Sequence, residues 1–449
     1  MSHPMRQHAI VVGAGMAGLA AAKALSAHFD RVTVLERDGL SSDAEPRRGT
    51  PQARHLHGLL TGGLNALTEL FPGFEQDLER AGAVRLRSED LRSERPGLDP
   101  FPQRDLGMGW WSVSRPLLEF ETRRHVEQQK NIELVGNRRV TEFVASPDGS
   151  AVTAVRCEAP DGRTETLAAD LVVDASGRGA LTQALLEKFG LPKPEEAEIG
   201  IDIAYSTAVF ERPVDAPSTW KIVMTFPAAP ESSRGALLAP IENDQWIVSV
   251  GGNHGDAPPG DIEGYLAFVK GLRTPTIYDA IKNAKRVGEI ARFLLPCSRR
   301  RHFETAQRFP RGLLVVGDAI CLFNPVFGQG MSVAAQEAVI LDRILVASAG
   351  ERDPLNGLAG AFFAAIQEVL ETPWSVAIND FIFPKTRGQR PADFEQRIRY
   401  GVALLRLAAE DASVHKLMIE VNHLLKPRSA LRAREISERV IKLMGAVPA

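Results

Sequence analysis

Short apolar runs and helical spacing predict a strand, a helix and a second strand at the start of the chain. His8 to Gly13 and Arg31 to Glu36 are apolar runs of strand length, and Met16 to His28 has the spacing of a helix. Runs of this length bounded by turn residues favour buried strands. The N-terminal segment is therefore predicted to be one βαβ unit.

The next part of the chain mixes helical and strand patterns. Leu59 to Leu70 and Arg115 to Gln129 have helical apolar spacing, whereas Ile132 to Pro147 is typical of a strand. Thr141 to Cys157 and Glu165 to Asp174 are predicted to form a hairpin closed by the PDG sequence between them, because Pro and Gly favour turns.

After Gly200 the pattern changes to alternation. The runs IAYSTAVF, WKIVMTF and QWIVSV are separated by Pro, Gly and Asn clusters, which predicts an antiparallel sheet. Gly312 to Val316 again has the pattern of a buried strand, Gly330 to Ala347 that of a helix, and the residues from about Phe394 that of a helical tail.

The net charge and the cysteine positions indicate which binding partners and which cellular compartment are favoured. The 449 residues carry a net charge of −3, so no positive field favours nucleic acid. Cys157, Cys297 and Cys321 stand far apart, which argues against a disulfide framework and a zinc site and favours a reducing cytoplasm.

One apolar segment has the length of a secretory signal peptide. It is AIVVGAGMAGLAAAKALSA, but its glycines and the strand-like RVTVLE that follows favour the βαβ unit. No other uninterrupted apolar run reaches the roughly 18 residues that span a bilayer. We therefore expect a cytoplasmic protein without membrane contact.

The sequence GAGMAG follows the first predicted strand and opens the first helix. Gly13 allows a tight turn, Gly15 lets the backbone approach a pyrophosphate, and Gly18 lets helix pack on strand. The helix N-terminus favours an anion, and Glu36 ends the second strand at about the separation of a ribose-binding acid. The segment predicts a dinucleotide site, without separating NAD from FAD.

A second glycine-rich segment, Gly312 to Ala338, favours FAD. Its strand ends in Gly-Asp, where Asp318 can accept hydrogen bonds from ribitol hydroxyls. Gly328 and Gly330 permit close approach of the backbone to a ring, and the helix that starts near Met331 directs its positive end at that ring.

Together these sequences resemble a known superfamily. GAGMAG with Glu36, SRPLLE around Arg115, VVDASG and GDAICLFNPVFGQGMS are similar to the FAD-dependent monooxygenases and epoxidases, which include aromatic hydroxylases, flavin halogenases and geranylgeranyl reductases. The pair PQARHLHGLL and FNPVFGQGMS most resembles bacterial epoxidase-like oxidoreductases of secondary metabolism.

The resemblance implies an α/β fold. It has a Rossmann-like, glutathione-reductase-like FAD-binding domain, an inserted antiparallel-sheet substrate domain and a helical C-terminal tail. The expected boundaries are residues 1–85, 110–180 and 305–350 for the FAD-binding domain, 86–109 and 181–304 for the substrate domain, and 351–449 for the C-terminal region.

The resemblance also implies a set of FAD-binding residues. Arg115 is expected to reach the diphosphate or ribityl side, Asp318 the ribityl and diphosphate, and Val140 the adenine through its backbone. The full expected set is Gly13, Ala14, Gly15, Gly18, Glu36, Arg37, Arg54, Arg115, Val140, Asp318, Gly328, Gly330 and Met331.

Two departures from related enzymes bear on the electron source and the product. Aromatic hydroxylases carry an acidic residue before Gly in a second dinucleotide motif, with Ser and Arg further on, where this chain has DASGRGALTQ. This favours reduction by a separate flavin reductase over direct use of NAD(P)H. The tryptophan-flanked motif of flavin halogenases is missing near TWKIVMTFP, which disfavours halogenation.

PQARHLHGLL, from Pro51 to Leu60, is predicted to pass along the isoalloxazine edge. In an extended segment His55 and His57 share one side and Arg54 the other. We expect both histidines to be catalytic and to line the flavin and substrate cavity, with Arg54 holding the negative charge of reduced flavin. A metal site, a covalent histidyl-flavin and histidines with only a structural role remain alternatives.

The implied function is an FAD-dependent monooxygenase. It would hydroxylate or epoxidise a hydrophobic small molecule with O2, through a flavin C4a-hydroperoxide, with electrons from NAD(P)H directly or through a flavin reductase. A flavin-dependent reductase or dehydrogenase of the geranylgeranyl-reductase type is one alternative, and a non-catalytic flavin-binding assembly protein is another.

Overall fold

A five-stranded parallel sheet forms the first half of the molecule. The computed structural model describes residues 7–445, and residues 1–6 and 446–449, the outer ends of the first and last predicted regions, lie outside the described residues. The strand order is β16-β10-β1-β2-β6, and every pair is parallel. The strands are β1 (His8–Val12), β2 (Arg31–Leu35), β6 (Ile132–Val135), β10 (Leu171–Asp174) and β16 (Leu313–Val315).

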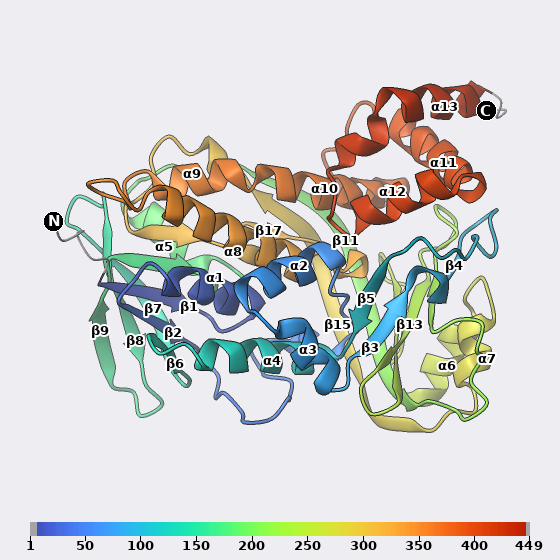
Figure 1. Cartoon of the computed structure of the whole chain (residues 1–449), viewed down its shortest axis with the longest axis horizontal. Helices are drawn as coiled ribbons and strands as arrows, with labels where there is room; N and C mark the ends of the chain where they lie inside the picture. Colours follow the sequence, from blue (N-terminus) through green and yellow to red (C-terminus); the bar gives the residue numbers. More distant parts are fainter. Residues whose placement is uncertain (1–6, 446–449) are drawn as a thin grey trace.

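Each face of this sheet is covered by a different layer, because alternate side chains point to opposite faces. Val11, Val34 and Val173 pack into the cluster formed with the helices, whereas Ile10 and Val172 pack toward a three-stranded antiparallel sheet (Figure 1). The helices are α1 (Met16–Ser26), α4 (Arg115–Glu127) and α8 (Gly330–Ala347), and the covering strands are β7 (Arg139–Ala145), β8 (Val152–Glu158) and β9 (Thr164–Ala168).

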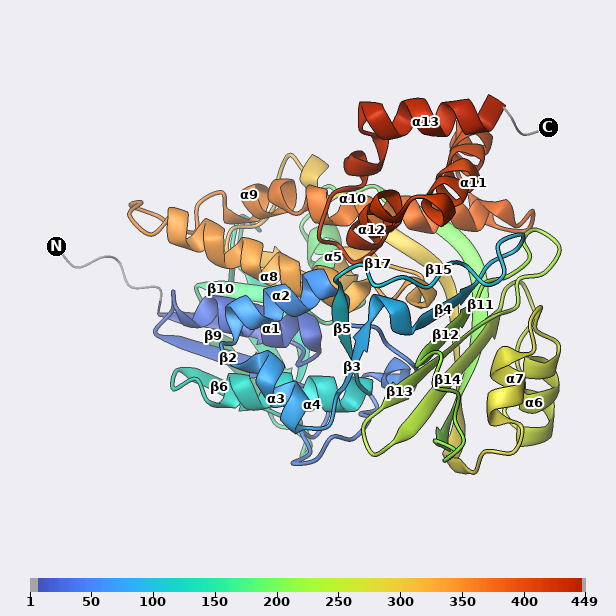
Figure 2. The ribbon, with the colours of Figure 1, turned by 45° about the vertical axis from the view of Figure 1, so that its right-hand side comes forward.

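The second half is built on an eight-stranded sheet that is mostly antiparallel. Its path is β17-β15-β11-β14-β13-β12-β4, with β18 paired to β11. The bounds are β4 (Leu91–Glu94), β11 (Glu196–Glu211), β12 (Ile222–Thr225), β13 (Gly235–Ile241), β14 (Gln245–Gly252), β15 (Arg286–Arg301), β17 (Cys321–Leu322) and β18 (Arg387–Gly388). Helices α6 (Ile262–Lys270) and α7 (Thr276–Ile281) lie against its outer face (Figure 2).

The remaining elements connect or cover the two sheets. They are η1 (Pro51–Arg54), α2 (Thr61–Leu70), α3 (Phe74–Arg80), β3 (Val84–Arg87), η2 (Ser88–Asp90), β5 (Gly109–Ser112), α5 (Ala180–Lys188), η3 (Phe303–Thr305), η4 (Gly317–Ala319) and η5 (Pro325–Phe327). The C-terminal region contains α9 (Leu358–Ala365), α10 (Gln367–Ala377), η6 (Ile378–Ile382), α11 (Phe394–Glu410), α12 (Ala412–Asn422), η7 (Arg428–Arg432) and α13 (Arg434–Gly445). Its last helices stand over the junction of the two halves (Figure 1).

The predicted α/β class, the antiparallel sheet after Gly200 and the helical tail are confirmed. Four local predictions are wrong. Thr141 to Cys157, predicted as one arm of a hairpin, is two strands, because β7 ends at Ala145 and β8 begins at Val152 and turns back to pair with it. Ile132 to Pro147 is two strands, because the turn at Gly136 to Arg138 hydrogen-bonds to Glu36 and Asp38 and separates β6 from β7. Glu165 to Asp174 is also split, since Leu171–Asp174 leaves the hairpin and pairs with β1 in the parallel sheet.

The fourth wrong prediction concerns PQARHLHGLL. Pro51–Arg54 is a single turn of 3₁₀-helix, not an extended segment. Pro51 stands at the start of the turn, where its fixed φ and missing N–H are compatible with helix. Extended backbone begins only at His55.

Among the described residues, no helix combines the length and the apolar character needed to span a lipid bilayer.

Candidate functional site

The GAGMAG turn connects β1 to α1, and its three glycines face different surroundings. Gly13 has a φ of +107°, and a Cβ on Gly18 would lie 1.9 Å from the carbonyl oxygen of Gly13. A Cβ on Gly15 would meet no protein atom within 4 Å. Two of the glycines are therefore required by the fold itself, whereas the space above Gly15, at the N-terminus of α1, is open to a phosphate.

Glu36 is held beside this turn by backbone donors. Its carboxylate accepts hydrogen bonds of 2.8 Å from Ala14 N and 3.0 Å from Asp38 N, and the side chain is buried. The acid predicted to bind ribose is thus fixed just after β2, against the GAGMAG turn.

Arg47, which the sequence pattern did not single out, lies at the centre of a buried ion-pair network. Its guanidinium lies 3.0 Å from Glu36 and 2.6 Å from Glu119, and it donates to the carbonyl of Ala14 at 3.0 Å. Arg115 pairs with the other oxygen of Glu119 at 2.8 Å. Burial alone would raise the pKa of Glu119, but Arg115 and Arg47 lower it below its usual value.

This network leaves a positive group without a hydrogen-bond acceptor. Within residues 7–445, the buried Nη1 of Arg115 has no hydrogen-bond partner. An unpartnered buried donor is costly unless a ligand accepts from it. An anionic group such as a diphosphate would satisfy it.

Asp318 lies where β16 ends and α8 begins. A Cβ on Gly330, the first residue of α8, would lie 3.8 Å from Oδ1 of Asp318. The residue is exposed. Desolvation by the surrounding protein raises the pKa of its carboxyl group to about 6, although the positive charge of Arg115 lowers it. Asp318 is therefore an accessible acceptor beside the N-terminus of α8.

The segment after η1 runs along the N-terminus of α8. A Cβ on Gly328 would lie 3.7 Å from Gly58 N, and Leu60 N donates to the Ser332 hydroxyl at 3.0 Å. The two stretches that carry the resemblance to epoxidase-like enzymes, PQARHLHGLL and FNPVFGQGMS, are thus in contact.

His57 presents one ring nitrogen toward this site. Nδ1 donates to the carbonyl of His55 at 2.9 Å, so Nε2 carries the free lone pair. Burial and then Arg115 lower the pKa of His57 to about 4. The ring is therefore neutral at pH 7 and can accept a hydrogen bond or a proton at Nε2.

His55 faces the second sheet. Nδ1 lies 2.7 Å from the Thr207 hydroxyl, and the ring packs edge-on against Tyr205 with centroids 4.5 Å apart. Burial, followed by the charges of His57 and Arg54, lowers its pKa to about 3. The two histidines, expected to share one side, have different partners: His55 bridges to β11, whereas His57 lies near Arg115.

The other expected cofactor residues occupy varied positions. Arg37 and Arg54 are exposed, and Met331 is partly buried in the first turn of α8. Val140 pairs with Cys157 between β7 and β8 and packs under the parallel sheet.

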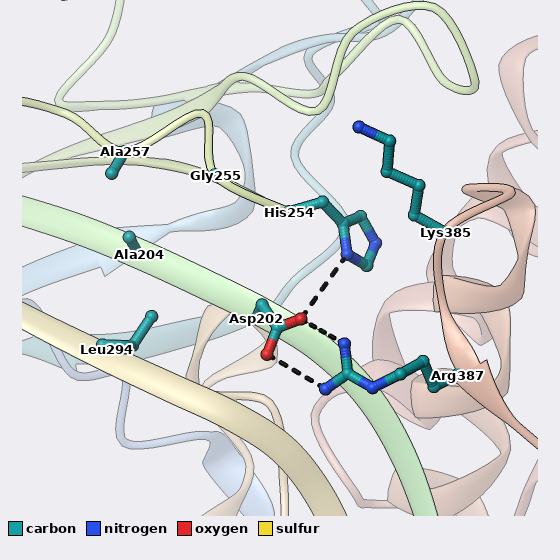
Figure 3. A pocket seen from close by; sticks show the side chains of 8 residues that line it. All are labelled: Asp202, Ala204, His254, Gly255, Ala257, Leu294, Lys385 and Arg387. Atoms are coloured by element: carbon teal, nitrogen blue, oxygen red, sulfur yellow. Dashed lines mark hydrogen bonds and ion pairs between the residues drawn. The ribbon is translucent and has the colours of Figure 1, made fainter.

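A hollow of about 480 Å³ lies elsewhere, on the outer side of the second sheet. Ala204 and Leu294 line it, whereas their neighbours Tyr205 and Phe293 point to the opposite face, toward His55. Asp202, His254 and Arg387 form its polar wall (Figure 3). None of the residues expected to bind FAD lines this hollow.

Comparison with known proteins decides the family. The model of the FAD binding domain family matches residues 6–356, more than half of the chain. The chain belongs to this family. It is therefore an FAD-dependent oxidoreductase of the monooxygenase family, as its resemblance to the superfamily predicted.

Two curated relatives of the chain come from bacteria. Protein Rv3254 of Mycobacterium tuberculosis is 34% identical over 410 residues, 86% of this chain and 84% of its own length. Kynurenine 3-monooxygenase of Salinispora tropica is 25% identical over 356 residues, 76% of this chain and 73% of its own. A solved p-nitrophenol 4-monooxygenase from Pseudomonas putida shares the fold, with a TM-score of 0.64 at 18% identity, covering 94% of this chain and 99% of that one.

The residues present fit FAD. The open space at Gly15 suits the diphosphate, the fixed carboxylate of Glu36 suits the adenosine ribose, and the Arg115 donor that lacks an acceptor suits an anion. Asp318 is accessible at the N-terminus of α8, where ribityl hydroxyls can reach it.

Proposed function

We propose that this protein is a cytoplasmic monooxygenase of secondary metabolism that hydroxylates or epoxidises an apolar small molecule with O2. The observation that carries the proposal is the contact of His55 with the inner face of the second sheet. There, next to the FAD-binding residues, Tyr205 and Phe293 belong to an apolar cluster with Ile203 and Leu295. The sequence likeness of PQARHLHGLL and FNPVFGQGMS to epoxidase-like enzymes supports an alkene substrate.

Bound FAD would supply the redox and dioxygen chemistry that side chains lack. The N-terminus of α8 stabilises negative charge beside it. The free Nε2 of His57 accepts or returns a proton, since its Nδ1 is committed to the carbonyl of His55. His55, Tyr205 and Phe293 keep water from the apolar side of the site.

The proposal includes a flavin reductase as the electron source. In DASGRGALTQ, the Asp174 carboxylate accepts from Ser176 N at 3.1 Å, from the Ser176 hydroxyl at 2.6 Å and from the Thr182 hydroxyl at 2.5 Å. Because Asp174 is fully buried, this carboxylate is not available to a nicotinamide nucleotide. Direct reduction by NAD(P)H is the competing route.

The deciding experiment has an anaerobic and an aerobic step. Purified holoenzyme is first titrated without oxygen with NADPH and NADH, then with a free flavin reductase, while the oxidised flavin band is followed. The reduced protein is then given a panel of apolar alkenes and aromatics with dioxygen labelled in heavy oxygen. One labelled oxygen atom in the product supports the proposal, whereas a hydrogenated product formed without oxygen identifies a reductase instead.

A further inference from the structure

A buried hydrogen bond connects the C-terminal region to the loop formed by residues 324–328, just before α8. Nδ2 of Asn324, in the FNPVFGQGMS stretch, donates to Oδ2 of Asp380 in η6 at 3.1 Å. Asn324 is 2% exposed and Asp380 6%. Asp380 lies beyond the residues that match the FAD binding domain family, which end at 356.

The second polar atom of Asn324 shapes the loop itself. Its Oδ1 accepts from Val326 N at 3.1 Å and so caps the turn Pro325–Phe327. This turn ends at Gly328, with a φ of +65°, next to Gly58 and immediately before α8. The amide of Asn324 therefore links the Asp380 carboxyl group to the turn that precedes the α8 N-terminus.

Asp380 is fixed from its own side as well. The Thr386 hydroxyl donates to the carbonyl of Asp380 at 2.7 Å. The following residues form β18, which pairs with β11, and Arg387 forms an ion pair with Asp202 (Figure 3). The carboxyl group of Asp380 is thus held near Asn324 by a segment that pairs with the second sheet.

The surroundings of Asp380 are apolar. Its neighbours Ala377 and Phe381 belong to the cluster of Ile199, Ile201 and Phe394. A buried carboxyl group in apolar surroundings is costly unless a partner forms a hydrogen bond or an ion pair with it. The partner in the structure is Asn324.

We propose that Asp380 is a positioning residue of the flavin site, which acts through Asn324 to hold the Pro325–Phe327 turn against the isoalloxazine ring. The inference rests on the position of the ring beside this turn, which belongs to the proposed function, but not on the oxygenation reaction. Binding of FAD and the environment of the flavin then depend on a residue of the C-terminal region.

The test compares Asp380→Ala, Asn324→Ala and the double variant with wild-type holoenzyme. FAD release on dilution gives the dissociation constant, the visible flavin spectrum reports the ring environment, and thermal unfolding reports the fold. We expect each single variant to raise the dissociation constant about tenfold and to shift the flavin spectrum, because each removes the same buried bond. Because Asn324→Ala also removes the cap on Val326 N, the double variant is expected to be no worse than Asn324→Ala alone.

Asp411→Ala is the matched control, since Asp411 caps α12 in the same region without contacting the loop. It is expected to change thermal unfolding but not the flavin spectrum. Wild-type affinity and spectrum in Asp380→Ala, or effects of the two single variants that add, would overturn the proposal. Failure of wild type to oxygenate any substrate would count against the proposed function alone.

Isosteric variants keep the test decisive if the alanine variants do not fold. Asn324→Asp sets two carboxyl groups against each other and is expected to weaken FAD binding about tenfold. Adding Asp380→Asn restores a donor and acceptor pair and is expected to recover most of the affinity. Absence of that recovery contradicts the proposal.

Discussion

The buried carboxyl group of Glu337 accepts a hydrogen bond of 2.7 Å from the backbone N–H of Gly317, the residue before Asp318. Glu337 lies on α8 and is 1% exposed. Burial raises the pKa of Glu337 to about 8. The Asp318 charge adds to this rise, whereas the hydrogen bond from the Gly317 N–H opposes it. This bond ties the Gly-Asp turn to α8, the helix whose N-terminus is expected to face the flavin.

Glu337→Gln is expected to change how stability depends on pH. The pKa of Glu337 rises from 4.5 to about 8 on folding, so its stabilising contribution is present below the unfolded pKa and is lost as the pH rises through the folded pKa. The stability of wild type relative to the variant should therefore fall between about pH 5 and pH 8, by at most about 1.4 kcal/mol per pH unit. Denaturant unfolding across this range measures it, with exposed Glu435→Gln as the control, and parallel curves for wild type and Glu337→Gln would contradict it.

Gly15→Ala and Gly18→Ala should fail in different ways. A Cβ on Gly15 meets no protein atom within 4 Å, so the variant should unfold like wild type but release FAD at least about tenfold more readily. A Cβ on Gly18 lies 1.9 Å from a backbone oxygen, so that variant should lose about 3 kcal/mol of stability or more. Thermal unfolding and FAD content of both proteins check this, and equal behaviour would show that the open space does not hold the diphosphate.

Arg47→Ala is expected to weaken both the fold and FAD binding. The change leaves the buried Glu36 without its cationic partner and removes one of the two cations beside Glu119. The cost should be about 3 kcal/mol in the free energy of unfolding. Arg48→Ala, at the exposed neighbouring residue, is the control and should change neither quantity. Retention of wild-type FAD affinity in Arg47→Ala would exclude Arg47 from the cofactor site.

His57→Ala and His57→Asn separate the two ring nitrogens of His57. Asn keeps a donor near Nδ1 for the carbonyl of His55, whereas both variants lose Nε2. If Nε2 handles a proton, turnover should fall about a hundredfold in both, while FAD content is better preserved in His57→Asn. His302→Ala, whose ring pairs with Glu304, is the control. Unchanged FAD content and turnover in His57→Ala would remove His57 from the site.

Local sequence patterns were sufficient to predict those parts of the candidate site that depend on backbone conformation. The turn at Gly13, the strand that ends at Glu36 and the helix from Gly330 follow from glycine placement and apolar spacing, and the structure has them within two residues of the predicted bounds. These features depend on residues that are close together in the sequence, so a sequence pattern can predict them. The paired strands of the hairpin prediction were misassigned because the partner of Leu171–Asp174 is β1, far away in the chain.

Sequence alone determined the class of fold, the glycine turn between β1 and α1 and the family, since each rests on short-range backbone geometry or on recognisable contiguous segments. Only the tertiary structure decided which polar side chains meet. Nothing local distinguishes Arg47 from Arg48, yet Arg47 reaches Glu119, 72 residues away. Asp380 likewise meets Asn324 across 56 residues. A buried charge or amide is tolerated only where a partner is brought to it, and the packing of helices and sheets, not the spacing of residues, brings that partner.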